Sequence, residues 1–136
     1  MFKSVCIIDD DPIYVFGTKK IMETTQFSNN FSVYKNGKQA IEYLIPKMIS
    51  GETLPDVILL DLNMPIMDGW QVLDELVKTS SHQKMNIFIA SSSVDNTDLE
   101  RAKSYDIVNR YIVKPFSIAK IKMLMDNTDN EFKIIK

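Results

Sequence analysis

Val57-Ile58-Leu59-Leu60-Asp61-Leu62-Asn63-Met64-Pro65 is the stretch that decides the fold, because four apolar residues run without interruption into an aspartate. A strand with one face in water alternates apolar and polar side chains, whereas a continuous apolar run is typical of a strand buried on both faces. Burial on both faces requires helices on both sides of a parallel sheet. The stretch therefore predicts a central strand that leads into Asp61.

Further short apolar runs predict strands at residues 5–8, 31–34, 87–90 and 111–113, and the central strand covers 57–60. Two segments outside these strands carry apolar residues at helical spacing: Trp70, Leu73, Leu76 and Val77, and then, after the last strand, Ile118, Ile121, Leu124 and Met125. We expect the first stripe to face the core rather than a cofactor. Because strand and helix alternate, the sequence predicts an α/β fold, a doubly wound five-stranded parallel sheet with helices on both faces.

Capping residues mark the starts of two helices. Asp11-Pro12 offers an N-cap followed by a proline at the first helical position, and Thr97 and Glu100 have the spacing of a capping box. Pro46 is expected to end or kink a helix that opens near Gly37.

Bulk composition limits the kinds of partner. With 136 residues and 45% hydrophobic content, the chain is long enough for one compact domain with its own core. A net charge of −2 gives no field that would draw the chain to phosphate backbones or anionic lipid, so we expect neither nucleic acid nor membrane as a partner. The single Cys6 lies in an apolar run and is expected to be a buried, inert thiol. No signal peptide is apparent, so a cytoplasmic location is expected.

Four of the predicted strands lead into polar residues. These are Asp9-Asp10-Asp11, Asp61, Ser91-Ser92-Ser93 and Lys114-Pro115. Ligands of open α/β sheets bind beyond the carboxyl ends of the strands, so we expect these side chains to share one rim. Carboxylate oxygens suit a hard cation such as Mg²⁺, while a hydroxyl and an ammonium group suit phosphate oxygens. The sequence thus predicts a site for a cation and a phosphoryl group.

Each of these groups also has a plainer interpretation. Asp11 is expected to cap a helix, the serines alone would form a loop, and Lys114 alone would be a solvated charge. A cap needs one carboxylate, and like charges about 5 Å apart repel by about 3 kcal/mol at an effective dielectric of about 20. Asp9 and Asp10 therefore favour a cation. His82, the only histidine, has no neighbouring ligand cluster and is not expected to bind metal or donate phosphate.

Four motifs together resemble the receiver domain of response regulators in two-component signal transduction. They are Ile7-Ile8-Asp9-Asp10-Asp11-Pro12, Leu59-Leu60-Asp61-Leu62-Asn63-Met64-Pro65-Ile66-Met67-Asp68-Gly69, Ile89-Ala90-Ser91-Ser92 and Lys114-Pro115-Phe116. The second motif is highly specific, and the resemblance covers about residues 4 to 126. It implies a flavodoxin-like strand order of 2-1-3-4-5 and a stand-alone, chemotaxis-regulator-like domain over residues 1–127, followed by a tail over 128–136.

The resemblance also implies a role for each motif residue. Asp61 would be the phosphoacceptor, and Ser91 and Lys114 would bind phosphoryl oxygens. Mg²⁺ would be held by Asp10, Asp61 and the backbone carbonyl of Asn63, with Asp9 acting through a water. Ser91 and Tyr111 would form the switch, and the Lys114-Pro115 bond would be cis.

Partners follow from the same resemblance. A histidine kinase or a histidine phosphotransfer protein would supply the phosphoryl group, and an output protein would bind the surface of the fourth helix, fifth strand and fifth helix. Such a protein is no enzyme beyond its own phosphorylation and dephosphorylation.

Other functions fit the motifs less well. A haloacid-dehalogenase-like phosphatase also carries an Asp-x-Asp signature, but it would want Thr or Val at Ile13 and an acidic pair soon after the lysine, where the next acid is Asp126. A pseudo-receiver would have lost some of the acids or the lysine, and a flavin or nucleotide carrier would need a glycine-rich loop. Residues 105–110 lack the Gly-Ala pair of many receivers. The tail, with Phe132, Ile134 and Ile135, is expected to pack, pair or fray.

Overall fold

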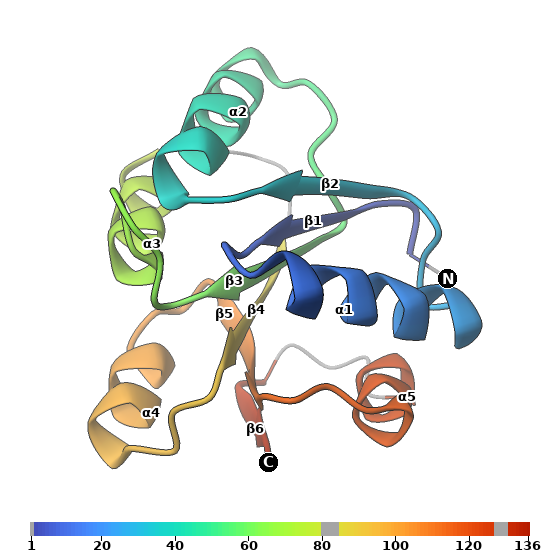
Figure 1. Ribbon diagram of the computed structural model, residues 1–136. Helices are drawn as coiled ribbons and strands as arrows, with labels where there is room; N and C mark the ends of the chain where they lie inside the picture. The colour runs from blue at the N-terminus through green and yellow to red at the C-terminus, as the bar shows by residue number, and fades with distance from the viewer. Residues whose placement is uncertain (1, 80–84, 127–130) are drawn as a thin grey trace.

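The computed structural model describes residues 2–79, 85–126 and 131–136, over which strands and helices alternate (Figure 1). His82 lies outside these residues. The strands are β1 (Val5–Ile8), β2 (Phe31–Tyr34), β3 (Val57–Asp61), β4 (Asn86–Ser91), β5 (Val108–Val113) and β6 (Lys133–Ile135). The helices are α1 (Pro12–Thr24), α2 (Gly37–Ser50), α3 (Gly69–Lys78), α4 (Asn96–Lys103) and α5 (Ile118–Asp126). No helix in the described ranges is long and apolar enough to span a membrane.

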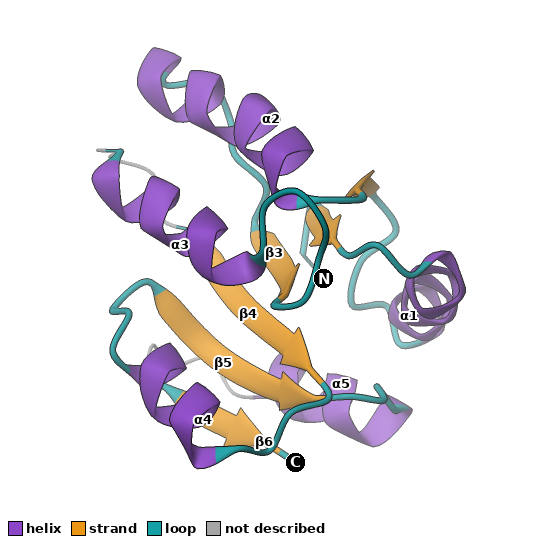
Figure 2. Cartoon of the chain, turned by 60° about the vertical axis from the view of Figure 1, so that its left-hand side comes forward, coloured by secondary structure: helices purple, strands orange, loops and turns teal. Residues whose placement is uncertain are grey.

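All strands lie parallel in one sheet, in the order β2-β1-β3-β4-β5-β6. The predicted order 2-1-3-4-5 is confirmed, and β6 extends the sheet beyond β5 (Figure 2). The chain moves outward from β1 to β2 and then returns to β3 on the other side of β1. At this reversal the loops that follow β1 and β3 turn to opposite faces of the sheet, which leaves room for a ligand between the two loops.

Helices cover both faces of the sheet and enclose two cores. α2, α3 and α4 lie on one face, and α1 and α5 lie on the other (Figure 1). Ile58 and Leu60 of β3 belong to the first core, whereas Val57 and Leu59 belong to the second. The continuous apolar run is thus buried on both faces, as predicted, and each side chain contributes roughly 1.5–3 kcal/mol by leaving water. β3 is therefore a firm support for Asp61.

Cys6 is buried in β1, as expected from the apolar run around it. Burial raises the pKa of its thiol to about 12. The thiol stays protonated at neutral pH, and a protonated thiol is a poor nucleophile and metal ligand.

Capping residues set the starts of the helices. Asp11 caps α1, as predicted, by accepting hydrogen bonds from the backbone N–H groups of Ile13 and Tyr14. The predicted cap of α4 is wrong, because Asp95 is the N-cap and accepts a hydrogen bond from the backbone N–H of Thr97. A carboxylate is a stronger acceptor than a hydroxyl for the free amides at a helix start. The helix therefore begins before Thr97.

Pro46 lies inside α2, which continues to Ser50 and ends at Gly51 with a φ of 77°. The helix was expected to end or kink at Pro46, and the structure shows that it does not end there. Proline removes the hydrogen bond to the carbonyl of Glu42, but both residues are exposed, so water can reach that carbonyl.

The apolar stripe of α3 is only partly buried. Trp70, Leu73 and Leu76 are buried, as predicted, whereas Val77 is 58% exposed. One step along a helix turns a side chain by about 100°, so Val77 points away from the core that Leu76 faces.

The tail pairs with the sheet, which is one of the three outcomes that the sequence left open. β6 lies beside β5, with Ile134 opposite Tyr111 and Ile135 buried. Arg110, itself buried, donates hydrogen bonds to the carbonyls of Asn109 and Glu131 just before β6. The predicted end of the domain at residue 127 lies outside the described residues.

Gly69→Ala is expected to destabilise the protein by about 1–3 kcal/mol, because overpacking strains a close contact. A Cβ atom at Gly69 would lie 2.5 Å from the carbonyl oxygen of Asp61 and 2.8 Å from the Cα of Leu62. Gly17→Ala is the matched control, since a Cβ there meets nothing within 4 Å, and alanine should stabilise α1 by about 0.5–1 kcal/mol. Urea unfolding measures both changes, and equal stability of the two variants would contradict this account.

Candidate functional site

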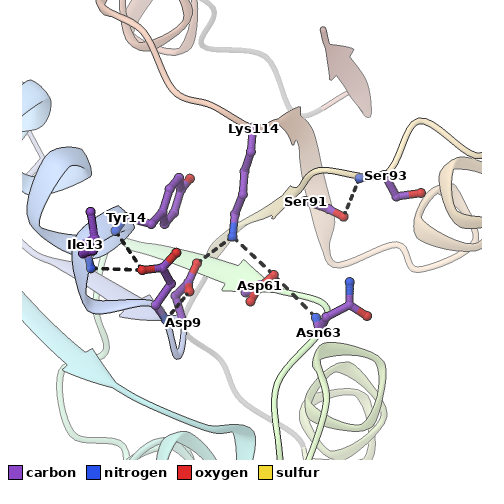
Figure 3. Close-up of polar contacts among 9 residues, drawn as sticks. Asp9, Ile13, Tyr14, Asp61, Asn63, Ser91, Ser93 and Lys114 are labelled. Atoms are coloured by element: carbon purple, nitrogen blue, oxygen red, sulfur yellow. Dashed lines mark hydrogen bonds and ion pairs between the residues drawn. The ribbon is translucent and has the colours of Figure 1, made fainter.

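The site lies where four strands end at the same edge of the sheet. Asp9 and Asp10 follow β1, Asp61 and Ser91 are the last residues of β3 and β4, and Lys114 follows β5. Parallel pairing aligns these ends, since Asp61 pairs with Ala90 and Ser91 with Val113. The predicted rim of polar side chains is therefore present (Figure 3).

Three carboxylates crowd together at this rim. One oxygen each from Asp9, Asp10 and Asp61 lie within 4.8 Å of one another. Asp9 and Asp61 are buried, with 3% and 6% of their surface exposed, whereas Asp10 is open to water. The fourth acid of the region, Asp11, is the N-cap of α1 and does not belong to this cluster.

Lys114 extends from β5 across the rim to two of the carboxylates (Figure 3). Its Nζ lies 2.9 Å from an oxygen of Asp9 and 3.5 Å from an oxygen of Asp61. Asp9 also accepts a hydrogen bond from the backbone N–H of Asp11, and Asp61 accepts one from the N–H of Asn63. The rim thus holds three carboxylates and one ammonium group, which leaves an excess of negative charge.

Burial and this excess charge together raise the pKa of Asp61. Burial raises the pKa of Asp61 to about 6, and the charge of Asp9 acts in the same direction. The ammonium group of Lys114 and the N–H of Asn63 oppose the rise in pKa without cancelling it. A cation beside Asp61 would favour the ionised carboxylate that can act as a nucleophile.

Two residues that the sequence did not single out hold Lys114 from other directions. The ring of Tyr14 lies under its ammonium group, with Nζ 4.1 Å from the ring centroid. Lys120 of α5 donates hydrogen bonds to the carbonyls of Val113 and Pro115, on either side of Lys114. The bond between Lys114 and Pro115 is cis, as the resemblance implied. A sequence pattern could not reveal the Tyr14 contact, because it joins the first helix to the residue that follows the fifth strand.

Ser91 and Tyr111 are joined through one intermediate residue. The hydroxyl of Ser91 accepts a hydrogen bond from the N–H of Ser93, and the carbonyl of Ser93 accepts one from the hydroxyl of Tyr111 at 3.0 Å. Tyr111 is fully buried. The two residues predicted as a switch therefore belong to one hydrogen-bonded chain between the rim and the core.

The donor set fits a magnesium ion. Mg²⁺ prefers oxygen ligands and is usually bound through one or two carboxylates together with waters and phosphate oxygens. The cluster provides three carboxylates, and Asp10 is exposed enough for an ion to enter. Nitrogen and sulfur ligands, which softer metals prefer, are absent from this cluster.

Comparison with known proteins agrees with these features. The chain matches the family of response regulator receiver domains over residues 5–126. It is 27% identical over 122 residues to the probable methanogenesis regulatory protein FilR2 of Methanothrix harundinacea, covering 90% of this chain and 78% of that protein. The chain spans half or less of the length of several longer curated relatives.

Solved structures share the fold. A two-component response regulator from Cytophaga hutchinsonii is 30% identical with a TM-score of 0.79, and the match covers 92% of this chain and 95% of that one. The receiver domain of the sensor histidine kinase PA1611 from Pseudomonas aeruginosa PAO1 has a magnesium ion coordinated in its active site cleft. It is 17% identical with a TM-score of 0.72, over 93% of this chain and 96% of that one.

Without metal, the protein is expected to lose stability as the pH rises from about 4 to about 7. The pKa of Asp61 is about 6 in the folded protein, compared with an ordinary value of 3.8, so the folded state binds more protons over this interval. The free energy of unfolding then falls with rising pH. The full shift corresponds to at most about 3 kcal/mol, and we expect about 1–2 kcal/mol after relaxation of the neighbouring charges.

Asp61→Asn should remove this pH dependence and make the metal-free protein more stable at pH 7, because the amide cannot ionise. Urea unfolding in the presence of a chelator, between pH 4 and pH 8, measures the slope for both proteins. If the slope were the same in both, the group responsible would be one other than Asp61.

Proposed function

Because the chain belongs to the response regulator receiver domain family, we propose that it accepts a phosphoryl group on Asp61 in a magnesium-dependent reaction. The donor would be a phosphohistidine of a histidine kinase or of a histidine phosphotransfer protein. The observation that carries the proposal is the position of Asp61, at the end of a buried strand and among Asp9, Asp10 and Lys114. The family consists of phosphoacceptors rather than turnover enzymes.

Magnesium would be held by Asp10, Asp61 and the backbone carbonyl of Asn63, with Asp9 acting through a water. When bound, the ion would neutralise charge on the carboxylates and on the phosphoryl oxygens. The crowded carboxylates support this assignment, and the PA1611 receiver domain, which has the same fold, holds magnesium in its cleft. Asp9 suits the indirect role because Lys114 and the N–H of Asp11 already bind its two oxygens.

Phosphoryl transfer would form a bond between a carboxylate oxygen of Asp61 and phosphorus while the bond from phosphorus to the donor nitrogen breaks. The carboxylate is a weak nucleophile toward a negative phosphoryl group, so alignment and charge neutralisation must supply the catalysis. Lys114 is placed to pair with a phosphoryl oxygen, since its Nζ already lies 3.5 Å from Asp61. Ser91 would donate its hydroxyl to another oxygen.

The signal would leave the site through Ser91. Rotation of the Ser91 side chain toward a phosphoryl oxygen would shift the oxygen that accepts the hydrogen bond from the N–H of Ser93, whose carbonyl accepts the bond from Tyr111. A hydrogen bond to a charged group contributes about 1.5–3 kcal/mol, which can shift a two-state population roughly 10- to 150-fold. The output surface would comprise α4, β5 and α5. Because β6 lies beyond β5 at the end of the sheet, β6 would also be part of this surface.

The rival functions lack comparable support. A haloacid-dehalogenase-like phosphatase needs acidic residues soon after the lysine, but Asp126 lies at the far end of α5. A pseudo-receiver would lack part of the site, whereas Asp9, Asp10, Asp61 and Lys114 are all present.

A small phosphodonor with Mg²⁺ is expected to add one phosphoryl group to the parent protein and none to Asp61→Asn. The amide lacks the nucleophilic oxygen. Asp11→Asn is the matched control, because Asp11 is in the same acidic run but caps α1, and asparagine is an equally good cap. Intact-mass measurement decides the outcome. Full phosphorylation of Asp61→Asn would place the acceptor elsewhere.

Asp10→Ala should weaken Mg²⁺ binding more than Asp9→Ala, because the first variant loses a direct ligand and the second a water-mediated one. Titration calorimetry with Mg²⁺ measures both affinities, and Asp11→Asn again serves as the control. Unchanged Mg²⁺ affinity in both alanine variants would remove the acidic pair from the metal site.

A further inference from the structure

Tyr14 lies on the first turn of α1 with its ring facing Lys114 (Figure 3). Lysine ammonium groups also lie over the rings of Tyr43, Phe16 and Phe31, at 5.1, 5.5 and 5.7 Å from the ring centroids. The distance of 4.1 Å from Lys114 to Tyr14 is shorter than any of these. A cation at this distance from a ring centroid is attracted to the face of the ring, and more strongly where water is excluded.

We propose that Tyr14 is a positioning residue for Lys114, and that its ring holds the ammonium group against Asp9 and Asp61, ready to pair with a phosphoryl oxygen. The inference rests on the proposed function, because it concerns the lysine that would neutralise the transferred group. Tyr14 itself touches neither the acceptor oxygen nor the donor in this account.

A lysine side chain needs such support more than an arginine would. Its four-carbon stem is flexible, and its ammonium group is a point charge without a preferred direction of approach. Asp9 and Asp61 attract Lys114 from one side, but both carboxylates would also be partners of a bound cation. The Tyr14 ring provides an attraction that does not depend on those carboxylates, so Lys114 keeps its position when they turn to the metal and the phosphoryl group.

The ring of Tyr14 is held in turn by its own neighbours. Phe116, which is buried, meets it edge to face with 5.7 Å between ring centroids. α1 is fixed at this end by the Asp11 cap. The hydroxyl of Tyr14 is buried, and its polar neighbour is the hydroxyl of Thr18 rather than Lys114. The aromatic face, rather than the hydroxyl, is therefore the part of Tyr14 that acts on Lys114.

The first test uses NMR of the metal-free parent protein. Protons on the Cε of Lys114 should be shifted upfield by the ring current of Tyr14, because they lie over its face. The shift should persist in Tyr14→Phe and disappear in Tyr14→Leu. An ordinary Lys114 shift in the parent, or an unchanged upfield shift in Tyr14→Leu, would overturn the inference. The parent measurement decides even if Tyr14→Leu fails to fold.

The second test measures binding of beryllofluoride, a phosphoryl mimic, by calorimetry at saturating Mg²⁺. Tyr14→Leu should bind about three- to tenfold more weakly than the parent, and Tyr14→Phe should bind equally well. Phe16→Leu is the matched control, since it removes an aromatic ring from the same helix, where Phe16 faces Lys20 instead.

The outcomes separate this inference from the proposed function. A parent protein that binds no mimic would overturn the proposed function and this inference with it. A parent that binds the mimic, with Tyr14→Leu binding equally well, would overturn the inference alone. Weaker binding by both Tyr14→Leu and Tyr14→Phe would assign the effect to the hydroxyl and would also overturn it.

Discussion

Crowding of like charges is the constraint on which the rest of the site depends. Asp9, Asp10 and Asp61 bring their oxygens within 4.8 Å of one another, and two of them are buried. Burial raises the pKa of Asp61 to about 6, and the charge of Asp9, which Lys114 does not cancel, acts in the same direction. A folded protein keeps such an arrangement only where the surrounding structure holds it in place. The charge that destabilises the metal-free protein is also what would attract a cation and, through the cation, a phosphoryl group.

The sheet supplies the firm structure that this crowding requires. Alternate side chains of β3 are buried in two different cores, so Asp61 stands at the end of a strand that is packed on both faces. The loop beyond Asp61 is held at close range by two glycines. The N–H of Gly69 bonds the carbonyl of Leu62, and the N–H of Gly37 bonds the carbonyl of Met67. A Cβ at either glycine would come within 2.5 Å of a backbone oxygen. Two glycines outside the carboxylate cluster thus help to position Asp61.

Sequence reasoning succeeded where the signal is local or repeats along the chain. Continuous apolar strands predicted the parallel sheet, and polar residues at the strand ends predicted which side chains would meet at its rim. It failed where two neighbouring residues compete for one role, as Asp95 and Thr97 do at the start of α4. At Pro46 the sequence left an end or a kink open, and the helix continues because solvent relieves the penalty. Tyr14 was missed for a different reason. A ring beneath a lysine one hundred residues away in sequence leaves no periodic or compositional trace.

The pairing of the tail limits what a phosphoryl group could change. Tyr111 is already buried, and β5 is paired on both sides, with β4 and with β6. A shift of β5 would have to break two sets of backbone hydrogen bonds at once. The loop from Ser91 to Asp95 has fewer ties than β5. Within it the N–H of Ser93 bonds the hydroxyl of Ser91 and the N–H of Asp95 bonds the hydroxyl of Ser93, and the hydroxyl of Tyr111 bonds the carbonyl of Ser93 from β5. A ligand shifts an equilibrium only through contacts that differ between the two states. A new contact at Ser91 would therefore act first on this loop and on the start of α4, and the doubly paired β5 would resist displacement.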